Sequence, residues 1–231
     1  MIKEAIILAG GFGTRLRDTV PDLPKCMAPV AGKPFLSYVI DYFKKQGIEK
    51  FIFALGYKSE MIEEYVSKQK INFQSSIEKD PLGTGGAIKL ACSKATEKNI
   101  LVLNGDTFFG IHLAEMNSFD QFHKADCTIA LKPMKDFERY GSVSLNDDQS
   151  IKRFEEKKFQ VSGFINGGIY ILEKDKFVME NLPERFSFEK DYLEKMNGNR
   201  RMFGCIQDQY FIDIGIPEDY HRAQTELPQN I

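Results

Sequence analysis

The sequence predicts an α/β fold in which helices flank a mostly parallel sheet, and two observations carry this prediction. Short apolar runs at residues 5–9, 51–55 and 100–103 have the length and composition of strands that are buried on both faces. Amphipathic segments alternate with these runs, and strand–helix–strand alternation is typical of a parallel sheet. Because ligands bind at the carboxyl ends of parallel strands, the residues that follow these runs are candidates for a site.

Each helix of the first half has a local signal. Residues 35–46 carry apolar side chains at helical spacing, and Gly47 ends this predicted helix. Ser59 is the predicted N-cap of a second helix. Residues 84–95 predict a third helix with a small apolar face.

The second half of the chain has a different pattern. Its apolar runs predict strands at residues 127–131, 142–145, 151–154, 164–172, 202–206 and 210–214. Two helices are predicted at residues 188–196 and 217–225. We expect this half to extend the sheet and to fold a lid over its edge. Since no repeat or linker divides the 231 residues, one domain with two lobes is expected.

The composition excludes several classes of protein. The net charge of −2 argues against broad binding of nucleic acid, so any anion site must be local. The apolar run near the N-terminus is too short for a signal peptide or a membrane span, and a cytoplasmic protein that does not bind membranes is expected. The aromatic residues, 12% of the chain, are explained equally well by core packing and by a homodimer interface.

The cysteines and histidines show no catalytic or metal-binding pattern. The four cysteines lie far apart without a CxxC pair, which is typical of free thiols in a reducing compartment: Cys26, Cys92, Cys127 and Cys205. The three histidines have no zinc-ligand spacing: His112, His123 and His221.

Residues 5–17, AIILAGGFGTRLR, form a strand that runs into three glycines and two arginines. Such a turn is typical of a phosphate site, because glycine lets the backbone approach the ligand closely. A dinucleotide fingerprint is excluded by Leu16 at the third glycine position, and the prolines of residues 17–34 prevent a long helix. Arg15 and Lys25 are the candidate cations. A structural glycine turn with solvated arginines explains the loop equally well.

Several stretches together resemble the sugar 1-phosphate nucleotidylyltransferase family. They are LAGGFGTRL at 8–16 with Pro24-Lys25, PLGTGGA at 81–87, NGD at 104–106, FEEK at 154–157 with NGGIY at 166–170, and FIDIGIP at 211–217. The resemblance spans nearly the whole chain. It implies a three-layer, Rossmann-like nucleotidyltransferase fold with a mixed, mostly parallel sheet. It also implies a nucleotide-binding lobe over about residues 1–125 and a small sugar-phosphate-binding lobe over about residues 126–231.

The resemblance implies transfer of a nucleotidyl group from an NTP to a sugar 1-phosphate, with release of pyrophosphate. The short chain, PLGTGGA at 81–87 and NGDTFF at 104–109 look most like guanylyltransferases that act on a heptose 1-phosphate, so we expect GTP and D-glycero-α-D-manno-heptose 1-phosphate as substrates. The product, GDP-heptose, would serve a surface glycan such as capsule or lipopolysaccharide. A hexose 1-phosphate guanylyl- or uridylyltransferase is one alternative. A non-catalytic nucleotide-sugar-binding subunit is another, and the presence of the expected catalytic residues argues against it.

The attacking sugar phosphate is already an anion, so this chemistry needs cations rather than a strong base. The resemblance implies that Arg15 contacts the β- and γ-phosphates and that Lys25 contacts the α-phosphate or the sugar phosphate. Asp106 and Asp213 are the expected ligands of Mg²⁺, which prefers carboxylate and phosphate oxygens. Asn-Gly-Asp is also a common turn, and from its sequence alone Asp106 is explained as a turn residue.

The nucleotide is expected to lie against the glycine loop and the PLGTGGA stretch. The residues concerned are Leu8, Ala9, Gly10, Gly11, Gly13, Thr14, Gly83 and Thr84. Glu78 favours guanine, because a carboxylate can accept hydrogen bonds from both the ring N–H and the amine of that base. A solvated glutamate explains Glu78 almost equally well.

The sugar phosphate is expected to contact Gly141, Glu156, Lys157 and Asn166. A site that binds hydroxyls with polar groups can discriminate strongly between sugars. The chain departs from the family here, since it has EEKKF where relatives often have a proline after the glutamate–lysine pair. Glu155 and Glu156 are both candidates, and Glu156 is preferred because it directly precedes Lys157.

Overall fold

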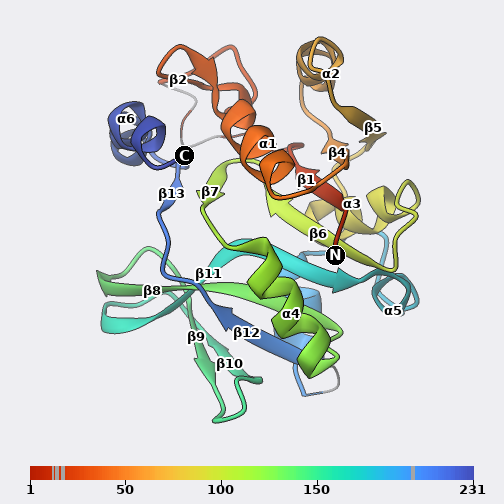
Figure 1. The fold of residues 1–231 in the computed structure, drawn as a ribbon, viewed down its shortest axis with the longest axis vertical. Coiled ribbons are helices and arrows are strands. Elements are labelled where there is room, and N and C mark those ends of the chain that lie inside the picture. The colour runs from red at the N-terminus through yellow and green to blue at the C-terminus, as the bar shows by residue number, and fades with distance from the viewer. Residues whose placement is uncertain (12, 14–15, 17–18, 199–200) are drawn as a thin grey trace.

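The computed structural model describes residues 1–11, 13, 16, 19–198 and 201–231. A nine-stranded mixed sheet runs through both halves of the chain in the order β10–β9–β11–β6–β1–β4–β5, with β8 paired to β11 and β12 paired to β8 (Figure 1). This sheet confirms the predicted α/β class.

The first half of the chain supplies four parallel strands. They are β1 (Glu4–Leu8), β4 (Lys50–Leu55), β5 (Asn72–Ile77) and β6 (Asn99–Asn104). β1 lies between β4 and β6, with Leu8 level with Ala54 on one side and with Asn104 on the other. The segments that follow β1 and β6 therefore leave the sheet at the same edge, as parallel pairing requires.

As predicted, the second half extends this sheet, and its strands pair mainly in the antiparallel sense. They are β8 (Cys127–Phe137), β9 (Ser142–Leu145), β10 (Ile151–Glu155), β11 (Gln160–Glu173) and β12 (Met202–Ile206). β11 joins the two halves, because residues 169–173 pair with β6 whereas Phe164 and Ile165 pair with β9. Its register against β8 shifts between Asn166 and Tyr170.

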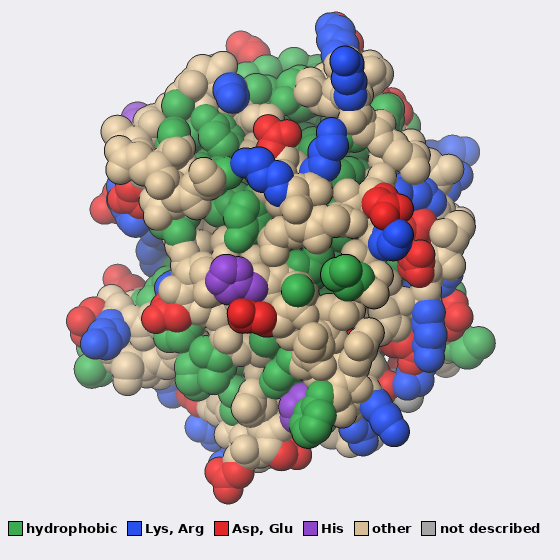
Figure 2. Space-filling view, in the orientation of Figure 1, with side chains coloured by type: hydrophobic (Ala, Val, Ile, Leu, Met, Phe, Trp, Pro, Cys, Tyr) green, Lys and Arg blue, Asp and Glu red, His purple; other side chains and the backbone are tan. Residues whose placement is uncertain are grey.

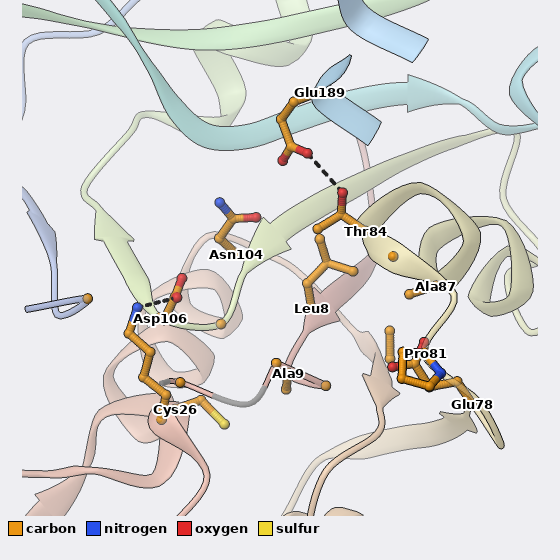
Figure 3. A pocket seen from close by; sticks show the side chains of 18 residues that line it. Leu8, Ala9, Cys26, Glu78, Pro81, Thr84, Ala87, Asn104, Asp106 and Glu189 are labelled. Atoms are coloured by element: carbon orange, nitrogen blue, oxygen red, sulfur yellow. Dashed lines mark hydrogen bonds and ion pairs between the residues drawn. The ribbon is translucent and has the colours of Figure 1, made fainter. Parts of the chain in front are cut away.

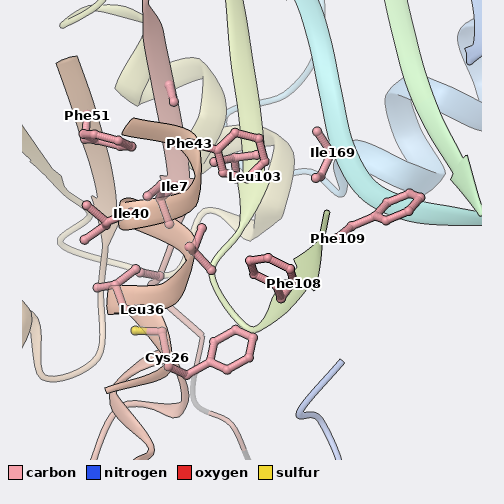
Figure 4. Close-up of a cluster of buried hydrophobic side chains, with 14 of the residues drawn as sticks. Ile7, Cys26, Leu36, Ile40, Phe43, Phe51, Leu103, Phe108, Phe109 and Ile169 are labelled. Carbon is pink, nitrogen blue, oxygen red and sulfur yellow. The ribbon is translucent and has the colours of Figure 1, made fainter. Parts of the chain in front are cut away.

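Helices cover both faces of the sheet and make three layers. α1 (Phe35–Lys45), α2 (Ser59–Ser67), α4 (Leu113–His123) and α6 (Pro217–Glu226) contribute to one core, part of which Figure 4 shows. The other core takes its side chains from α3 (Gly83–Cys92), α5 (Lys174–Val178) and the π-helix η3 (Phe188–Glu194). The two cores lie on opposite faces of β1, since Ile7 belongs to the first core and its neighbour Ile6 to the second.

The helix termini follow local chemistry, with one correction. Gly47 has a φ of +97°, and the N–H of Ile48 donates to the carbonyl of Phe43, so α1 ends in a Schellman motif at the predicted glycine. The prediction that Ser59 caps α2 is wrong. Ser59 is the first helical residue, and Lys58 takes the cap position with a φ of 52° and no side-chain cap bond.

Several short elements lacked a clear sequence pattern and were not predicted. They are β5, β7 (Thr107–Phe109), α4, α5, and the two-residue strands β2 (Pro29–Val30) and β3 (Lys33–Pro34), together with the 3₁₀ turns η2 (Lys25–Met27) and η4 (Leu227–Gln229). β13 (Phe211–Asp213) was predicted, but it pairs with β7 in a separate two-stranded ribbon and not with the main sheet. α3 ends at Cys92, three residues before the predicted end.

The surface agrees with the low net charge. On the face drawn in Figure 2, acidic and basic side chains are interspersed, with no field of one sign. Among the described residues, no helix has the length and apolar character needed to cross a bilayer.

Candidate active site

A cavity of about 440 Å³ lies at the carboxyl ends of the parallel strands (Figure 3). Ten of the residues that the sequence predicted as site residues line it: Leu8, Ala9, Gly10, Gly11, Gly13, Lys25, Glu78, Gly83, Thr84 and Asp106. Among the described residues, eight more line it: Cys26, Ala54, Pro81, Ala87, Asn104, Gly105, Glu189 and Gly215. The volume is in the range of small-molecule sites.

The floor of the cavity depends on glycines that permit close backbone contacts. A Cβ at Gly105 would lie 2.6 Å from the carbonyl oxygen of Leu8, which accepts a 2.9 Å hydrogen bond from the N–H of Gly105. This bond joins the NGD turn to the end of β1. A Cβ at Gly10 would lie 3.0 Å from the backbone nitrogen of Gly56. The strand ends thus pack backbone to backbone, which leaves the space above them open.

Lys25 reaches the cavity from a segment that cannot form a long helix. Pro24 precedes the single 3₁₀ turn η2, which begins at Lys25. The stem of Lys25 packs on Gly13, where a Cβ would lie 2.9 Å from the Cβ of Lys25 and where φ is +59°. The Lys25 side chain is only 11% exposed, so its ammonium lies inside the site.

The ammonium of Lys25 lies between two carboxylates. Its Nζ is 2.5 Å from Oδ2 of Asp106 and 3.5 Å from Oδ1 of Asp213. Pairing of β7 with β13 brings these residues together, because Asp213 is level with Thr107 in the ribbon. The carboxylate of Asp213 also accepts a 2.7 Å hydrogen bond from the N–H of Gly215. Two predicted metal ligands and a predicted catalytic cation are therefore in contact.

The donor chemistry of this cluster fits a magnesium ion. One cation, the ammonium, already contacts both carboxylates, so a single metal ion can reach Asp106 and Asp213. Across the part of the chain that the structure describes, no three His, Cys, Asp or Glu side chains gather into a metal site. Mg²⁺ is commonly bound by one or two carboxylates, with phosphate oxygens of the substrate and water molecules as its other ligands.

Glu78 forms the opposite end of the cavity, just after β5. Its Oε2 accepts a 3.0 Å hydrogen bond from the N–H of Leu82. Its Oε1 packs against two glycines, since a Cβ added to Gly10 would lie 3.3 Å from this oxygen and a Cβ added to Gly56 would lie 2.6 Å from it. The carboxylate is therefore placed by backbone contacts and is not freely solvated.

One wall is built from two distant segments. Oε2 of Glu189, on η3, accepts a 2.8 Å hydrogen bond from Oγ1 of Thr84, and Ser187 donates to the same oxygen. Two glycines make this contact possible. A Cβ on Gly85 would lie 2.1 Å from the ring of Phe186, and a Cβ on Gly86 would lie 2.4 Å from the carbonyl oxygen of Glu184. The sequence analysis missed Glu189, since 105 residues separate it from Thr84.

Of the other unpredicted lining residues, Asn104 had a sequence signal, because it belongs to the NGD stretch at the end of β6. Cys26 lies beside Lys25, and its thiol is buried. Burial, reinforced by the charge of Asp106, raises the pKa of the Cys26 thiol to about 12. This thiol therefore stays protonated at neutral pH and is a poor nucleophile. All four cysteines are free thiols, as predicted.

The predicted sugar-phosphate residues other than Lys25 do not line this cavity. Glu156 and Lys157 are exposed in the connection between β10 and β11. Glu155 is engaged within its own sheet: hydrogen bonds from Ser144, Lys158 and Arg153, in that order of importance, lower the pKa of its carboxyl to about 2. Of the two adjacent glutamates, Glu156 has its side chain on the exposed side.

Asn166 and Gly141 have structural partners within the second half. The amide of Asn166 donates to the hydroxyl of Tyr170 at 2.9 Å and accepts from the N–H of Gly168 at 3.0 Å, which fits the register shift in β11. A Cβ at Gly141 would lie 2.7 Å from the carbonyl oxygen of Glu155.

Asp213 does not line the cavity but reaches it through Lys25. Thr14 and Arg15, predicted to contact the nucleotide, lie outside the described residues.

The chain matches known proteins over nearly its full length. The family model for nucleotidyl transferases matches residues 4–230. The D-glycero-alpha-D-manno-heptose 1-phosphate guanylyltransferase of Aneurinibacillus thermoaerophilus is 53% identical over 99% of this chain and 100% of the relative. The protein of the same description from Campylobacter jejuni subsp. jejuni is 48% identical over 94% of this chain and 97% of the relative.

A solved structure agrees with these matches. The crystal structure of HddC from Yersinia pseudotuberculosis complexed with GMP-PN has a TM-score of 0.88 and 37% sequence identity, and the match covers 96% of this chain and 98% of that one. The predicted three-layer α/β fold is therefore confirmed both by the sheet and helix layers described above and by this solved relative.

Proposed function

The chain belongs to the nucleotidyl transferase family, and on this premise we propose that it transfers the guanylyl group of GTP to D-glycero-α-D-manno-heptose 1-phosphate, with release of pyrophosphate. The observation that carries the transfer chemistry is the contact of Lys25 with Asp106 and Asp213 at the end of a glycine-lined cavity, and the similarity to heptose 1-phosphate guanylyltransferases supports the choice of substrates. Nucleotidyl transfer brings two phosphate anions together, and this cluster supplies a cation and carboxylates that can hold a metal ion to neutralise their charge.

The reaction is attack by a phosphate oxygen of the sugar phosphate on the α-phosphorus of GTP. A new P–O bond forms to this oxygen as the bond between the α-phosphorus and the bridging oxygen breaks, and pyrophosphate leaves. Because the attacking oxygen is already anionic, no general base is required. This agrees with the cavity: the described residues that line it include no histidine, and the one cysteine among them, Cys26, is a neutral thiol.

Lys25 acts on charge that develops on phosphate oxygens. Its ammonium is held at the phosphate end of the cavity by the turn after Pro24 and is largely withdrawn from solvent, where a charge interaction is stronger than in water. We assign Arg15 to the leaving pyrophosphate, on the family resemblance alone.

Asp106 and Asp213 would hold Mg²⁺. The ion would neutralise charge on the nucleotide phosphates and lower the cost of bringing a second anion close. The two carboxylates are positioned by the NGD turn and by the β7–β13 ribbon, so their separation is set by backbone pairing.

The substrates are assigned to opposite ends of the site. The purine would lie against Leu8 and Ala9, with Glu78 accepting hydrogen bonds from guanine. The sugar would bind on the side of β10 and β11, where Glu156, Lys157, Asn166 and Gly141 are the candidate contacts. The cavity also takes Glu189 and Gly215 from the second half of the chain. The proposed lobes, with a boundary near residue 125, therefore share the nucleotide site.

The test is pyrophosphate release from the full chain with Mg²⁺. Each of GTP, UTP, CTP and ATP is combined with D-glycero-α-D-manno-heptose 1-phosphate, mannose 1-phosphate and glucose 1-phosphate. We expect release with GTP and the heptose phosphate, and its loss in Lys25→Ala, in Asp106→Ala and on chelation of the metal. Lys68→Ala is the matched control, because Lys68 is an exposed residue just after α2.

Other outcomes separate the alternatives. Faster release with a hexose phosphate or with UTP would keep the reaction and change the substrate. Nucleotide binding without pyrophosphate release for any pair would reject transfer with these substrates and favour a binding subunit.

A further inference from the structure

The site places a lysine where a metal ion is expected. The Lys25 ammonium contacts the same two carboxylates that would bind the ion, at 2.5 and 3.5 Å. Magnesium ligands lie at about 2.0–2.1 Å from the ion, so an ion bound to both carboxylates would stand next to this ammonium. The two cations would repel each other, and this repulsion is stronger than in bulk water because the Lys25 side chain is only 11% exposed.

The ammonium has little space to move within the cluster. A Cβ on Gly215 would lie 2.9 Å from Nζ of Lys25 and 2.8 Å from Oδ1 of Asp213, so the backbone of Gly215 closes one side. The start of the side chain is held against Gly13. The side chain beyond Cβ can rotate toward the open cavity, which Lys25 also lines.

We propose that Lys25 and the divalent cation bind Asp106 and Asp213 in turn. In the ligand-free enzyme the ammonium of Lys25 neutralises the two carboxylates. When the metal arrives with the nucleotide, the metal takes the carboxylates and the ammonium moves onto phosphate oxygens. The inference rests on the proposed metal-assisted transfer. By this proposal, Lys25 competes with the free metal for the two carboxylates and binds the phosphates of the metal–nucleotide complex. The free enzyme therefore binds the bare ion weakly and takes it up together with the nucleotide.

The first experiment measures metal binding without any substrate. Mn²⁺ is titrated into wild type, Lys25→Met and Lys25→Gln, and free Mn²⁺ is followed by electron paramagnetic resonance. We expect both variants to bind one Mn²⁺ at least about tenfold more tightly than wild type, as expected for coupled charges in contact. Lys68→Met removes the same charge from an exposed site and should bind Mn²⁺ as wild type does.

The second experiment uses the unaltered chain, so it does not depend on how a variant folds. A crystal structure with Mn²⁺ and a non-hydrolysable GTP analogue should show the metal on Asp106 and Asp213, and Lys25 Nζ on a phosphate oxygen more than 4 Å from both carboxylates.

Three results would overturn the proposal: no tighter Mn²⁺ binding in the Lys25 variants, an equal change in Lys68→Met, or a Lys25–Asp106 ion pair that persists with the metal bound to both carboxylates. The titration contains no GTP or sugar phosphate. A failure of the proposed transfer reaction would therefore leave its result intact and separately interpretable.

Discussion

The two ends of the proposed site are built in different ways. At the nucleotide end, turns after parallel strands meet at one edge, and glycines let their backbones touch, so ten predicted residues line one cavity. At the sugar end, the candidates lie on antiparallel strands and their connections, outside that cavity, and Asn166 and Gly141 contact their own sheet. At the nucleotide end, parallel strands place most of the predicted residues at one edge of the sheet, whereas the sugar-end candidates on the antiparallel strands of the main sheet stay outside the cavity. The short antiparallel ribbon of β7 and β13 is an exception, because it brings Asp213 to Lys25 and Asp106.

The largest expected effect tests the charge cluster at the nucleotide end. In Lys25→Ala, kcat for pyrophosphate release should fall by about a hundredfold or more, because a preorganised charge is removed from the transferring phosphate. Steady-state kinetics with saturating GTP and sugar phosphate measures this. A fall of less than tenfold, with Lys68→Ala unchanged, would contradict a catalytic role for the ammonium.

The second prediction tests whether the wall of the cavity depends on close backbone contacts. Gly85→Ala places a Cβ 2.1 Å from the ring of Phe186 and should lower the free energy of unfolding by about 1–3 kcal/mol. Gly11→Ala is the matched control, because no atom of the described residues lies within 4 Å of a Cβ added there; its stability should change by less than about 0.5 kcal/mol. Urea unfolding followed by circular dichroism compares them. Equal stabilities would show that the Thr84–Glu189 wall is loosely packed.

The third prediction tests the base end. Glu78→Gln keeps an acceptor for the N–H of Leu82 but removes the charge that we expect to bind guanine. The ratio of kcat/KM for GTP to that for UTP should fall about tenfold, the magnitude of one lost charge-assisted hydrogen bond. An unchanged ratio would remove Glu78 from base recognition.

The smallest expected effect tests the sugar end. Glu156→Gln should raise the KM for the sugar phosphate about threefold to tenfold, with little change in the KM for GTP, because a hydrogen bond to a hydroxyl weakens. Glu155→Gln is the comparison, since this carboxylate already accepts from Ser144 and Arg153. A larger effect in Glu155→Gln would exchange the assigned roles of these two residues.

Local patterns in the sequence were sufficient to predict much of the fold. Buried strands appear as short apolar runs, and Gly47 ends α1 because left-handed backbone there requires a residue without a Cβ. Ser59 was misassigned as a cap because its polar side chain resembles a cap, while the backbone makes the turn one residue earlier, at Lys58. β5 was missed because its residues are mostly polar and its edge position buries few of them.

The sequence by itself determined the α/β class and the glycine loop, because both depend on residues close together in the chain, and the short stretches that resemble the family named Lys25, Asp106 and Asp213 as candidate residues. Only the tertiary structure decided that one ammonium lies between those two carboxylates, and that Glu189 supports Thr84 across the cavity. These contacts join distant segments, since Lys25 and Asp106 are 81 residues apart and Thr84 and Glu189 are 105 residues apart. They are fixed by pairing of β7 with β13 and by packing of η3 on α3, which no local pattern records.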